Sequence, residues 1–91
     1  MKVTLRETAL ADLDSIYDWI AKDNPQNAIS VTERLLDAME NKLAHFPFMG
    51  RQDQMQGTRE WVVRGLPYII VYRVEDEVLS IISVFHGARN R

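Results

Sequence analysis

The stretch "YIIVYRVEDEVLSIISVF", Tyr68 to Phe85, defines the fold class of this chain. Residues 68–74 and 78–85 are rich in β-branched and aromatic side chains, which favour β-strands. The acidic triplet "EDE" between them has the length and polarity of a hairpin turn. Both predicted strands are almost continuously apolar, so we expect burial on both faces or one face that a partner covers.

Two more strands are predicted outside this pair. The segment "REWVV", residues 59–63, alternates polar and apolar side chains and is separated from Tyr68 by the turn "RGLP". It completes a three-strand antiparallel meander. The segment "KVTL", residues 2–5, alternates in the same way, but nothing in the sequence fixes its position in the sheet. Residues 47–58, rich in Gln and Gly and without periodicity, are predicted to form a loop.

Two helices are predicted between the first strand and this loop. Apolar residues recur at steps of three and four over residues 10–20, and a second apolar stripe covers residues 25–44. Thr8 is the predicted N-cap of the first helix, and Asn24 caps the second, with Pro25 in its first turn. The short connection makes the helices antiparallel. The predicted fold is α+β, in the order β-α-α-β-β-β. An antiparallel sheet carries the helical hairpin on one face, and residues 1–91 form one domain.

The composition narrows the class of protein. A chain of 91 residues supports one domain, and its lack of cysteine excludes a disulfide or a thiolate metal site. A net charge of -2 lacks the basic excess typical of nucleic-acid binding, so we expect no sequence-specific contact with nucleic acid. The N-terminus has no apolar signal segment, and the longest apolar runs are too short for a membrane helix. We therefore expect a cytoplasmic protein without membrane contact.

Neither a cofactor nor a metal is expected from the side chains present. The two histidines, His45 and His86, lie far apart in the sequence without a ligand-like spacing. No serine lies in a nucleophile elbow, and no glycine-rich phosphate loop is present. We interpret Asp12, Asp14 and Asp18 as the solvated face of the first helix.

Arginines are the most informative charged residues. Arg59 and Arg64 flank the strand at 59–63, Arg73 interrupts an apolar strand, and Arg89 lies in the C-terminal tail. A charge in a buried strand is costly without a partner. Arg73 therefore either pairs with Glu60 on the neighbouring strand or lies on the uncovered sheet face, where it would bind phosphate or carboxylate.

Two aromatic residues allow two interpretations each. Trp19 lies beside the apolar stripe of the first helix, so it either completes the core or forms an exposed anchor for a partner. Trp61 presents the same choice, and its place in an alternating strand favours the core.

Several segments, in order along the chain, resemble the ParE branch of the ParE/RelE toxin superfamily. They are "ALADLDSIYDWIAKDNP", "LAHFPFMGR", "GTREWVV", "YIIVYRV" and "VLSIISVFHGAR". These toxins belong to bacterial type II toxin–antitoxin systems, including plasmid-stabilisation systems. The resemblance implies the fold predicted above. It also implies a ParD-like antitoxin whose flexible C-terminal segment surrounds the toxin.

The resemblance also implies a choice between two activities. The ParE branch poisons DNA gyrase through protein contact, whereas the RelE branch cleaves messenger RNA on the ribosome. RelE-type chains place basic residues at alternate positions of the strand before the "Y…VY" strand, and an arginine directly after its first tyrosine. This chain has Glu60, Val62 and Ile69 there, which cannot stabilise developing negative charge on a phosphate. We therefore expect a gyrase inhibitor that is not an enzyme.

Two alternatives stay open from the sequence. The chain is a ribosome-dependent mRNA endonuclease, or an inactive relative that only binds its antitoxin. In the endonuclease the catalytic residues would be Glu60, Arg73 and His86, with Glu60 and His86 as acid and base. The residues expected to bind partners are Trp19, Arg59, Arg64, Arg73, His86 and Arg89.

Overall fold

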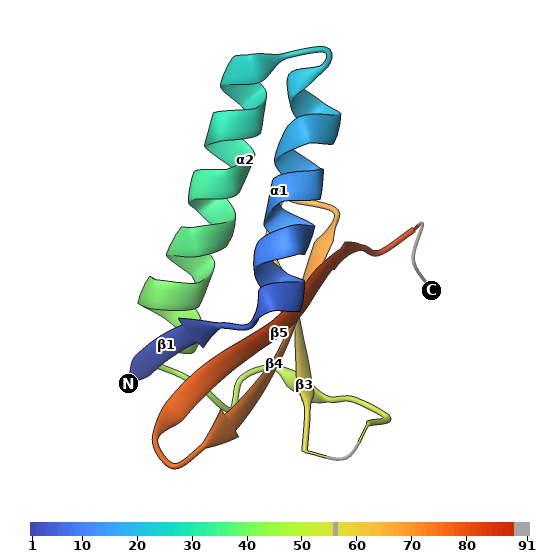
Figure 1. The fold of residues 1–91 in the computed structure, drawn as a ribbon. Helices are drawn as coiled ribbons and strands as arrows, with labels where there is room; N and C mark the ends of the chain where they lie inside the picture. The colour runs from blue at the N-terminus through green and yellow to red at the C-terminus, as the bar shows by residue number, and fades with distance from the viewer. Residues whose placement is uncertain (56, 89–91) are drawn as a thin grey trace.

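The structure is a computed structural model that describes residues 1–55 and 57–88. Its elements in chain order are β1 (Lys2–Leu5), α1 (Glu7–Ala21), α2 (Pro25–Asp37), the π-helical segment η1 (Ala38–Leu43), β2 (Arg51–Gln52), β3 (Arg59–Val62), β4 (Tyr68–Glu75) and β5 (Val78–His86) (Figure 1). The predicted order β-α-α-β-β-β is confirmed. Among the described elements, β2 is the strand that was not predicted, and it lies inside the segment predicted to be a loop.

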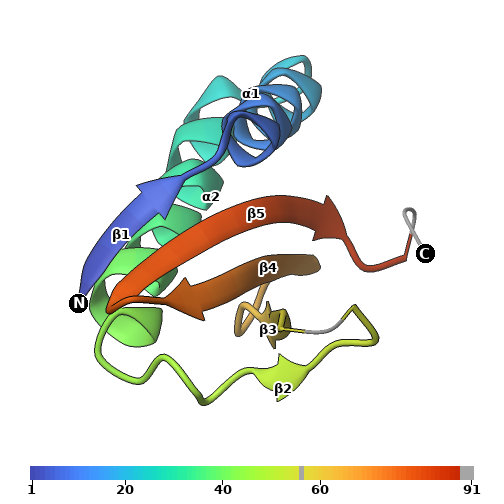
Figure 2. The ribbon, with the colours of Figure 1, turned by 60° about the horizontal axis from the view of Figure 1, so that its bottom comes forward.

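Within the described residues the sheet has five strands in the order β1-β5-β4-β3-β2, which Figure 2 shows as adjacent ribbons. The predicted meander is confirmed, because β3, β4 and β5 pair antiparallel in succession. The first strand differs from the expected antiparallel arrangement. It pairs parallel to β5, with Val3 opposite Leu79. The sheet is therefore mixed, although antiparallel pairs predominate.

The turn between β4 and β5 consists of Asp76 and Glu77. Both residues have positive φ, 51° and 61°. Two residues in this conformation form the hairpin turn whose twist matches that of the flanking strands. The strands are then irregular at one point, because Val71 lies opposite Ser83 while Tyr72 lies opposite Ile81. Ile82 is thus the extra residue of a β-bulge, an irregularity that locally bends and twists the strand that carries it.

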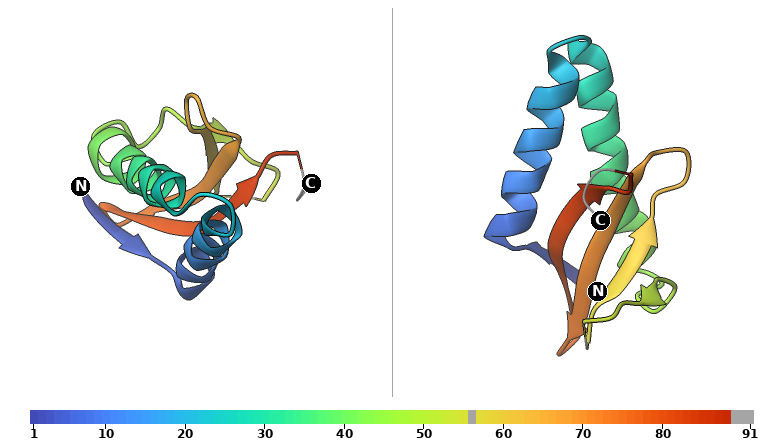
Figure 3. Two further views of the ribbon diagram at one scale, coloured as in Figure 1. Left: turned by 90° about the horizontal axis from the view of Figure 1, so that it is seen from above. Right: turned by 90° about the vertical axis from the view of Figure 1, so that its right-hand side faces the viewer.

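The two helices form the predicted antiparallel hairpin over one face of the sheet (Figure 3). The second cap is confirmed, because the Asn24 side chain accepts a hydrogen bond of 3.0 Å from the N–H of Asn27. The prediction of Thr8 as the N-cap of the first helix is wrong. The helix begins at Glu7, Arg6 occupies the N-cap position, and the Thr8 hydroxyl donates to the carbonyl of Ile82 instead. No helix in the described ranges is long and apolar enough to cross a membrane.

The second helix does not continue as an α-helix to Ala44. It changes to the wider π-helical winding of η1 at Ala38. Met39 and Leu43 are fully buried there, so the winding keeps the apolar stripe against the sheet. The core that joins helices and sheet contains side chains with no exposed surface, namely Ala9, Leu35, Met39, Leu43, Ile70, Tyr72, Leu79 and Ile81.

Candidate functional site

The loop after η1 is fixed to the core by Tyr72. The Tyr72 hydroxyl donates to the carbonyl of Pro47 at 2.8 Å and accepts from the N–H of Gly50 at 3.0 Å. Burial raises the pKa of Tyr72, although the Gly50 hydrogen bond and the positive charge of Arg59 act in the opposite direction. The two hydrogen bonds of Tyr72 hold the residues just before β2 against β4. The loop between η1 and β2 is therefore held in a fixed position against the sheet.

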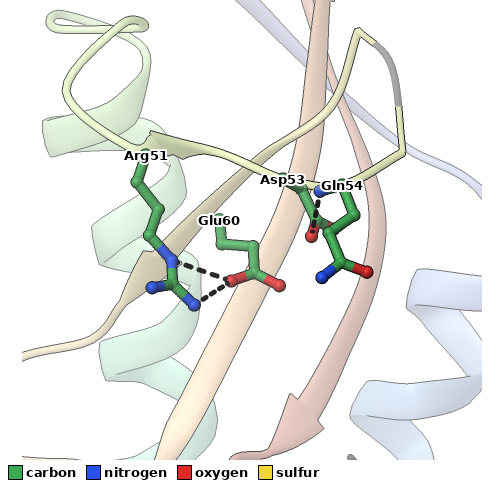
Figure 4. Close-up of polar contacts among 4 residues, drawn as sticks. All are labelled: Arg51, Asp53, Gln54 and Glu60. Carbon is green, nitrogen blue, oxygen red and sulfur yellow. Dashed lines mark hydrogen bonds and ion pairs between the residues drawn. The ribbon is translucent and has the colours of Figure 1, made fainter.

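Glu60 of β3 is a buried carboxylate that lies opposite Arg51, the residue with which β2 begins. Its Oε1 accepts from Arg51 Nη2 at 2.9 Å and from Nε at 3.2 Å (Figure 4). The Glu60 side chain is 4% exposed and that of Arg51 is 76% exposed. Arg51 shields the carboxylate from water and neutralises its charge. Sequence reasoning missed Arg51 because a two-residue strand leaves no periodic signal.

The same close-up shows how the chain leaves β2. The backbone N–H of Gln54 donates to Asp53 Oδ1 at 2.7 Å (Figure 4), and Asp53 N–H donates to the carbonyl of Thr58 at 3.0 Å. Aspartate is common in turns because its short side chain can bond the neighbouring backbone. These contacts return the chain to β3.

Arg73 lies on the same face of the sheet as Glu60. Glu60 forms an ion pair with Arg51. Arg73 Nη1 lies 4.0 Å from Oε1 of Glu75, which is also in β4. A Cβ atom added to Gly57 would lie 3.7 Å from Arg73 Nε. The loop at Gly57 therefore lies directly beside this guanidinium group.

The other described arginines of the predicted site have structural contacts. Arg59 Nη1 donates to the carbonyl of Gly50 at 2.8 Å, and its guanidinium carbon lies 5.2 Å from the centre of the Phe48 ring. Arg64 is exposed, and its carbonyl accepts from Arg34 Nη2 at 2.8 Å. Arg89 lies outside the described residues.

Trp19 and His86 lie together in one groove, which we call the α1/β5 groove. It consists of two adjoining hollows of about 260 Å³ and 420 Å³, and both are lined by Trp19, Tyr68 and His86. Trp19 is 56% exposed, so it is not a core residue, and Lys22 Nζ lies 5.4 Å from its ring centre. His86 packs edge-on against Tyr68 with ring centroids 5.5 Å apart. Trp61, by contrast, is half-buried against the core, as predicted.

Asp12 has a different position from the one predicted. We expected a solvated side chain, but Asp12 Oδ2 accepts from the backbone N–H of Val84 at 2.9 Å. Together with Thr8 it binds the edge of β5 beyond the point where β1 ends. The position could not be read from the sequence, because it depends on the bulge at Ile82 and on the start of α1.

The three residues of the endonuclease alternative are not gathered at one place. Glu60 lies opposite Val71, so its side chain shares a sheet face with Arg73 two residues along β4. His86 lies opposite Tyr68, a core residue on the face that the helices cover. The positions of Tyr68 and Arg73 are about 17 Å apart along an antiparallel strand. No group of three or more His, Asp or Glu side chains within residues 1–55 and 57–88 is arranged to hold a metal ion.

Comparison with solved structures defines the class of protein. The fold matches the chromosomal ParDE TA system from P. aeruginosa with a TM-score of 0.77 and 21% identity, covering 94% of this chain and 95% of that chain. It also matches the toxin–antitoxin complex RelBE2 from Mycobacterium tuberculosis, with a TM-score of 0.62 and 24% identity, covering 93% of this chain and 95% of that chain. At these identities the likeness establishes the ParE/RelE toxin fold.

Comparison of sequences gives the family. The profile described as "ParE toxin of type II toxin-antitoxin system, parDE" matches residues 3–91. The chain is 42% identical over 84 residues to Y4kP of Sinorhizobium fredii, a candidate toxin, covering 92% of this chain and 83% of that protein. It is 40% identical over 81 residues to Toxin RelE2 of Caulobacter vibrioides, covering 89% of each. The chain belongs to the ParE toxin family of type II toxin–antitoxin systems.

Proposed function

We propose that this toxin acts in the cytoplasm by inhibiting DNA gyrase through protein contact, and that a ParD-like antitoxin neutralises it. The observation that carries the gyrase target is the chemistry of β3 and β4. Glu60 is buried and paired with Arg51, Val62 is 59% exposed, and Ile69 is half-buried. These positions present a carboxylate and apolar side chains, whereas phosphate chemistry needs preorganised positive charge.

The antitoxin partner is supported by the solved relatives, which are toxin–antitoxin complexes. We propose that the antitoxin binds in the α1/β5 groove and contacts Trp19 and His86 there. A large exposed aromatic side chain between two hollows is the type of residue that anchors protein interfaces. A disordered antitoxin segment suits such a surface, because it can follow a groove that a rigid partner would not fill.

The proposal is tested with purified gyrase. The toxin, freed from its antitoxin, is added to a DNA supercoiling and cleavage assay, and the antitoxin is then added back. We expect loss of supercoiling or trapped cleaved DNA, reversed by the antitoxin. Folded toxin that leaves gyrase unaffected would overturn the gyrase target.

A parallel assay separates the two other functions. The same preparation is added to ribosomes translating a defined messenger RNA, and the RNA is examined for cleavage. Cleavage of the messenger RNA at defined codon positions, with gyrase unaffected, would establish the endonuclease. Glu60→Gln and His86→Ala would then be the first variants to compare. Activity in neither assay, with antitoxin binding intact, would establish an inactive relative.

A further inference from the structure

Residues 46–50, which we call the 46–50 loop, present two exposed phenylalanines on a fixed backbone. Phe46 and Phe48 are each 65% exposed, although phenylalanine is usually a buried residue. Pro47 lies between them, and its carbonyl accepts the hydrogen bond of 2.8 Å from the buried Tyr72 hydroxyl. Large apolar side chains that lie close together on a surface mark sites of interaction.

Arg59 fixes the same loop from the side of β3. Its Nη1 donates to the carbonyl of Gly50 at 2.8 Å and to that of Phe48 at 3.3 Å, and its guanidinium carbon lies 5.2 Å from the centre of the Phe48 ring. Where the loop begins, the N–H of Phe46 donates to the carbonyl of Lys42 at 2.9 Å. The loop therefore has little backbone entropy to lose on binding, and a preorganised surface binds more tightly for that reason.

Each phenylalanine borders a hollow. Phe46 lines a hollow of about 710 Å³ between η1 and β3, and Phe48 lines one of about 570 Å³ beside residues 52–54 and 57–59. The larger hollow is also lined by Trp61, which is half-buried, and by Val62, which is 59% exposed. A partner that covers the loop can place its own side chains in both hollows. Exposed aromatic side chains beside such hollows are typical of interface hot spots.

The charged side chains that line the two hollows are mostly basic. They are Arg34, Lys42, Arg64 and Asp37 in the larger hollow and Arg59 and Asp53 in the smaller one. Basic side chains are thus twice as many as acidic ones here, whereas the whole chain has a net charge of -2. Complementary charge then favours a partner surface with carboxylates. The excess is small compared with the basic patch of a nucleic-acid interface, so a protein fits this surface better than DNA does.

The 46–50 loop lies away from the α1/β5 groove. Tyr68 lines the groove and Tyr72 holds the loop, and these positions are about 13 Å apart along β4. Figure 2 shows the chain after α2 leading into β2 at one edge of the sheet, whereas β1 forms the other edge. None of residues 46–50 lines the groove. The toxin therefore has a second surface suited to a protein partner.

We propose that the 46–50 loop is the surface through which this toxin contacts gyrase. Phe46 and Phe48 enter an apolar depression on gyrase, and carboxylates at the border of that depression face Lys42 and Arg64. The inference rests on the proposed gyrase target and adds which part of the toxin touches it. The toxin is small, with a radius of gyration of 12.6 Å, so an antitoxin bound in the α1/β5 groove can still obstruct gyrase by its volume.

The first test compares the wild-type toxin with the double variant Phe46→Ala/Phe48→Ala in the supercoiling assay. We expect the toxin concentration that halves supercoiling to rise at least about tenfold, the loss typical of hot-spot side chains. Antitoxin affinity should stay within about twofold of the wild type, because the loop does not line the α1/β5 groove. Ile29→Ala removes a large side chain of α2 that is 49% exposed, and this control should inhibit gyrase as the wild type does.

A charge variant tests the border of the same surface. Lys42 is exposed, and Lys42→Glu should weaken inhibition more at low salt than at high salt, because salt screens attraction between exposed charges. Thermal unfolding of each variant confirms that it is folded before its inhibition is compared. Inhibition by folded Lys42→Glu that equals the wild type at low salt would contradict the expected carboxylates of gyrase.

A second measurement uses the wild-type toxin alone. Hydroxyl-radical oxidation of Phe46 and Phe48 should slow when gyrase is added, whereas oxidation of Trp19 should slow when the antitoxin is added. Unchanged oxidation of both phenylalanines in the gyrase complex, or full inhibition by the folded double variant, would overturn the loop assignment while the gyrase target stands. Protection by duplex DNA without gyrase would assign the loop to nucleic acid and overturn it as well. A wild-type toxin that leaves gyrase unaffected would overturn the proposed target, and the loop assignment with it.

Discussion

The hydroxyl of Tyr72 accepts a hydrogen bond from the backbone N–H of Gly50, 22 residues away in the sequence, at 3.0 Å. The same hydroxyl donates to Pro47, so one buried oxygen fixes both ends of a short loop. This contact positions Arg51 beside Glu60 and starts β2. It also places the segment "PFMGR" beside the second tyrosine of "YIIVYRV", which is Tyr72.

Gly50→Ala should destabilise the protein by about 1–3 kcal/mol, because a buried site without free volume has to move its neighbours. A Cβ atom at Gly50 would lie 2.4 Å from the Tyr72 hydroxyl and 2.7 Å from the backbone carbonyl of Glu60. Denaturant unfolding gives the difference. Gly87→Ala is the control, since its Cβ would meet the flexible end of Ile69 at 3.3 Å and the Pro67 carbonyl at an ordinary contact distance of 3.6 Å, and it should cost little. Equal stability of the two variants would contradict the role of the contact.

Tyr72→Phe should change how stability depends on pH. Burial raises the pKa of Tyr72 above the value of about 10 that it has in the unfolded chain. The unfolded chain therefore ionises first, so this stabilisation is complete below the unfolded pKa and is lost as pH rises through the folded pKa. We expect wild-type stability to fall more steeply than that of Tyr72→Phe above about pH 10. Unfolding free energies measured across this range would run parallel if Tyr72 were not responsible.

At neutral pH, Tyr72→Phe should itself cost about 1–3 kcal/mol, because Pro47 and Gly50 lose their buried hydrogen-bond partner. The two effects can be separated in a plot of unfolding free energy against pH. Loss of the ionisable hydroxyl changes the slope above about pH 10, whereas loss of the hydrogen bonds lowers the unfolding free energy at neutral pH as well.

Asp12→Ala should loosen the end of β5. The N–H of Val84 would lose its partner at 2.9 Å, and a buried donor left without a bond costs about 1–3 kcal/mol. The measurement is amide exchange of Val84, which we expect to become faster in the variant. Asp14→Ala, an exposed change on the same helix, should stay within about 0.5 kcal/mol of the wild type. Unchanged exchange at Val84 would show that Asp12 does not protect the strand edge.

Trp19→Ala should weaken antitoxin binding by about 2 kcal/mol or more, the loss typical of a central aromatic anchor. Its effect on stability should be small, because 56% of the side chain is already exposed. Calorimetric titration and thermal unfolding of the same variant give the two quantities. Large destabilisation with unchanged affinity would make Trp19 a packing residue and would remove it from the proposed interface.

The fold was predictable where a pattern repeats over many residues. The apolar steps of α1 and α2, the cap at Asn24 and the β-branched strands β4 and β5 are each determined by neighbours in sequence. The sequence contains no such signal for β2, because two residues form no period. It contains none for η1 either, because a π-helical turn preserves the apolar stripe while changing its winding.

The candidate site was less predictable, because its contacts join distant segments. Asp12 looks solvated on a helical wheel, and only the bulge at Ile82 brings the Val84 N–H to it. Arg59 was selected for its charge, yet it holds the loop at Gly50. For Trp19 the sequence left a core position and an exposed anchor open, and in the structure the side chain is 56% exposed in the α1/β5 groove.

The parallel pairing of β1 with β5 has a consequence for how the protein is made. Among the described elements, the strand that leaves the ribosome first pairs with the strand that leaves it last. During synthesis the helical hairpin can form early from local contacts, but the sheet waits for β5, because long-range strand pairing is the slow part of folding. The nascent chain therefore carries an incomplete sheet until β5 has been synthesised. The α1/β5 groove, which Trp19 and His86 line, therefore takes shape only once β5 has joined the sheet.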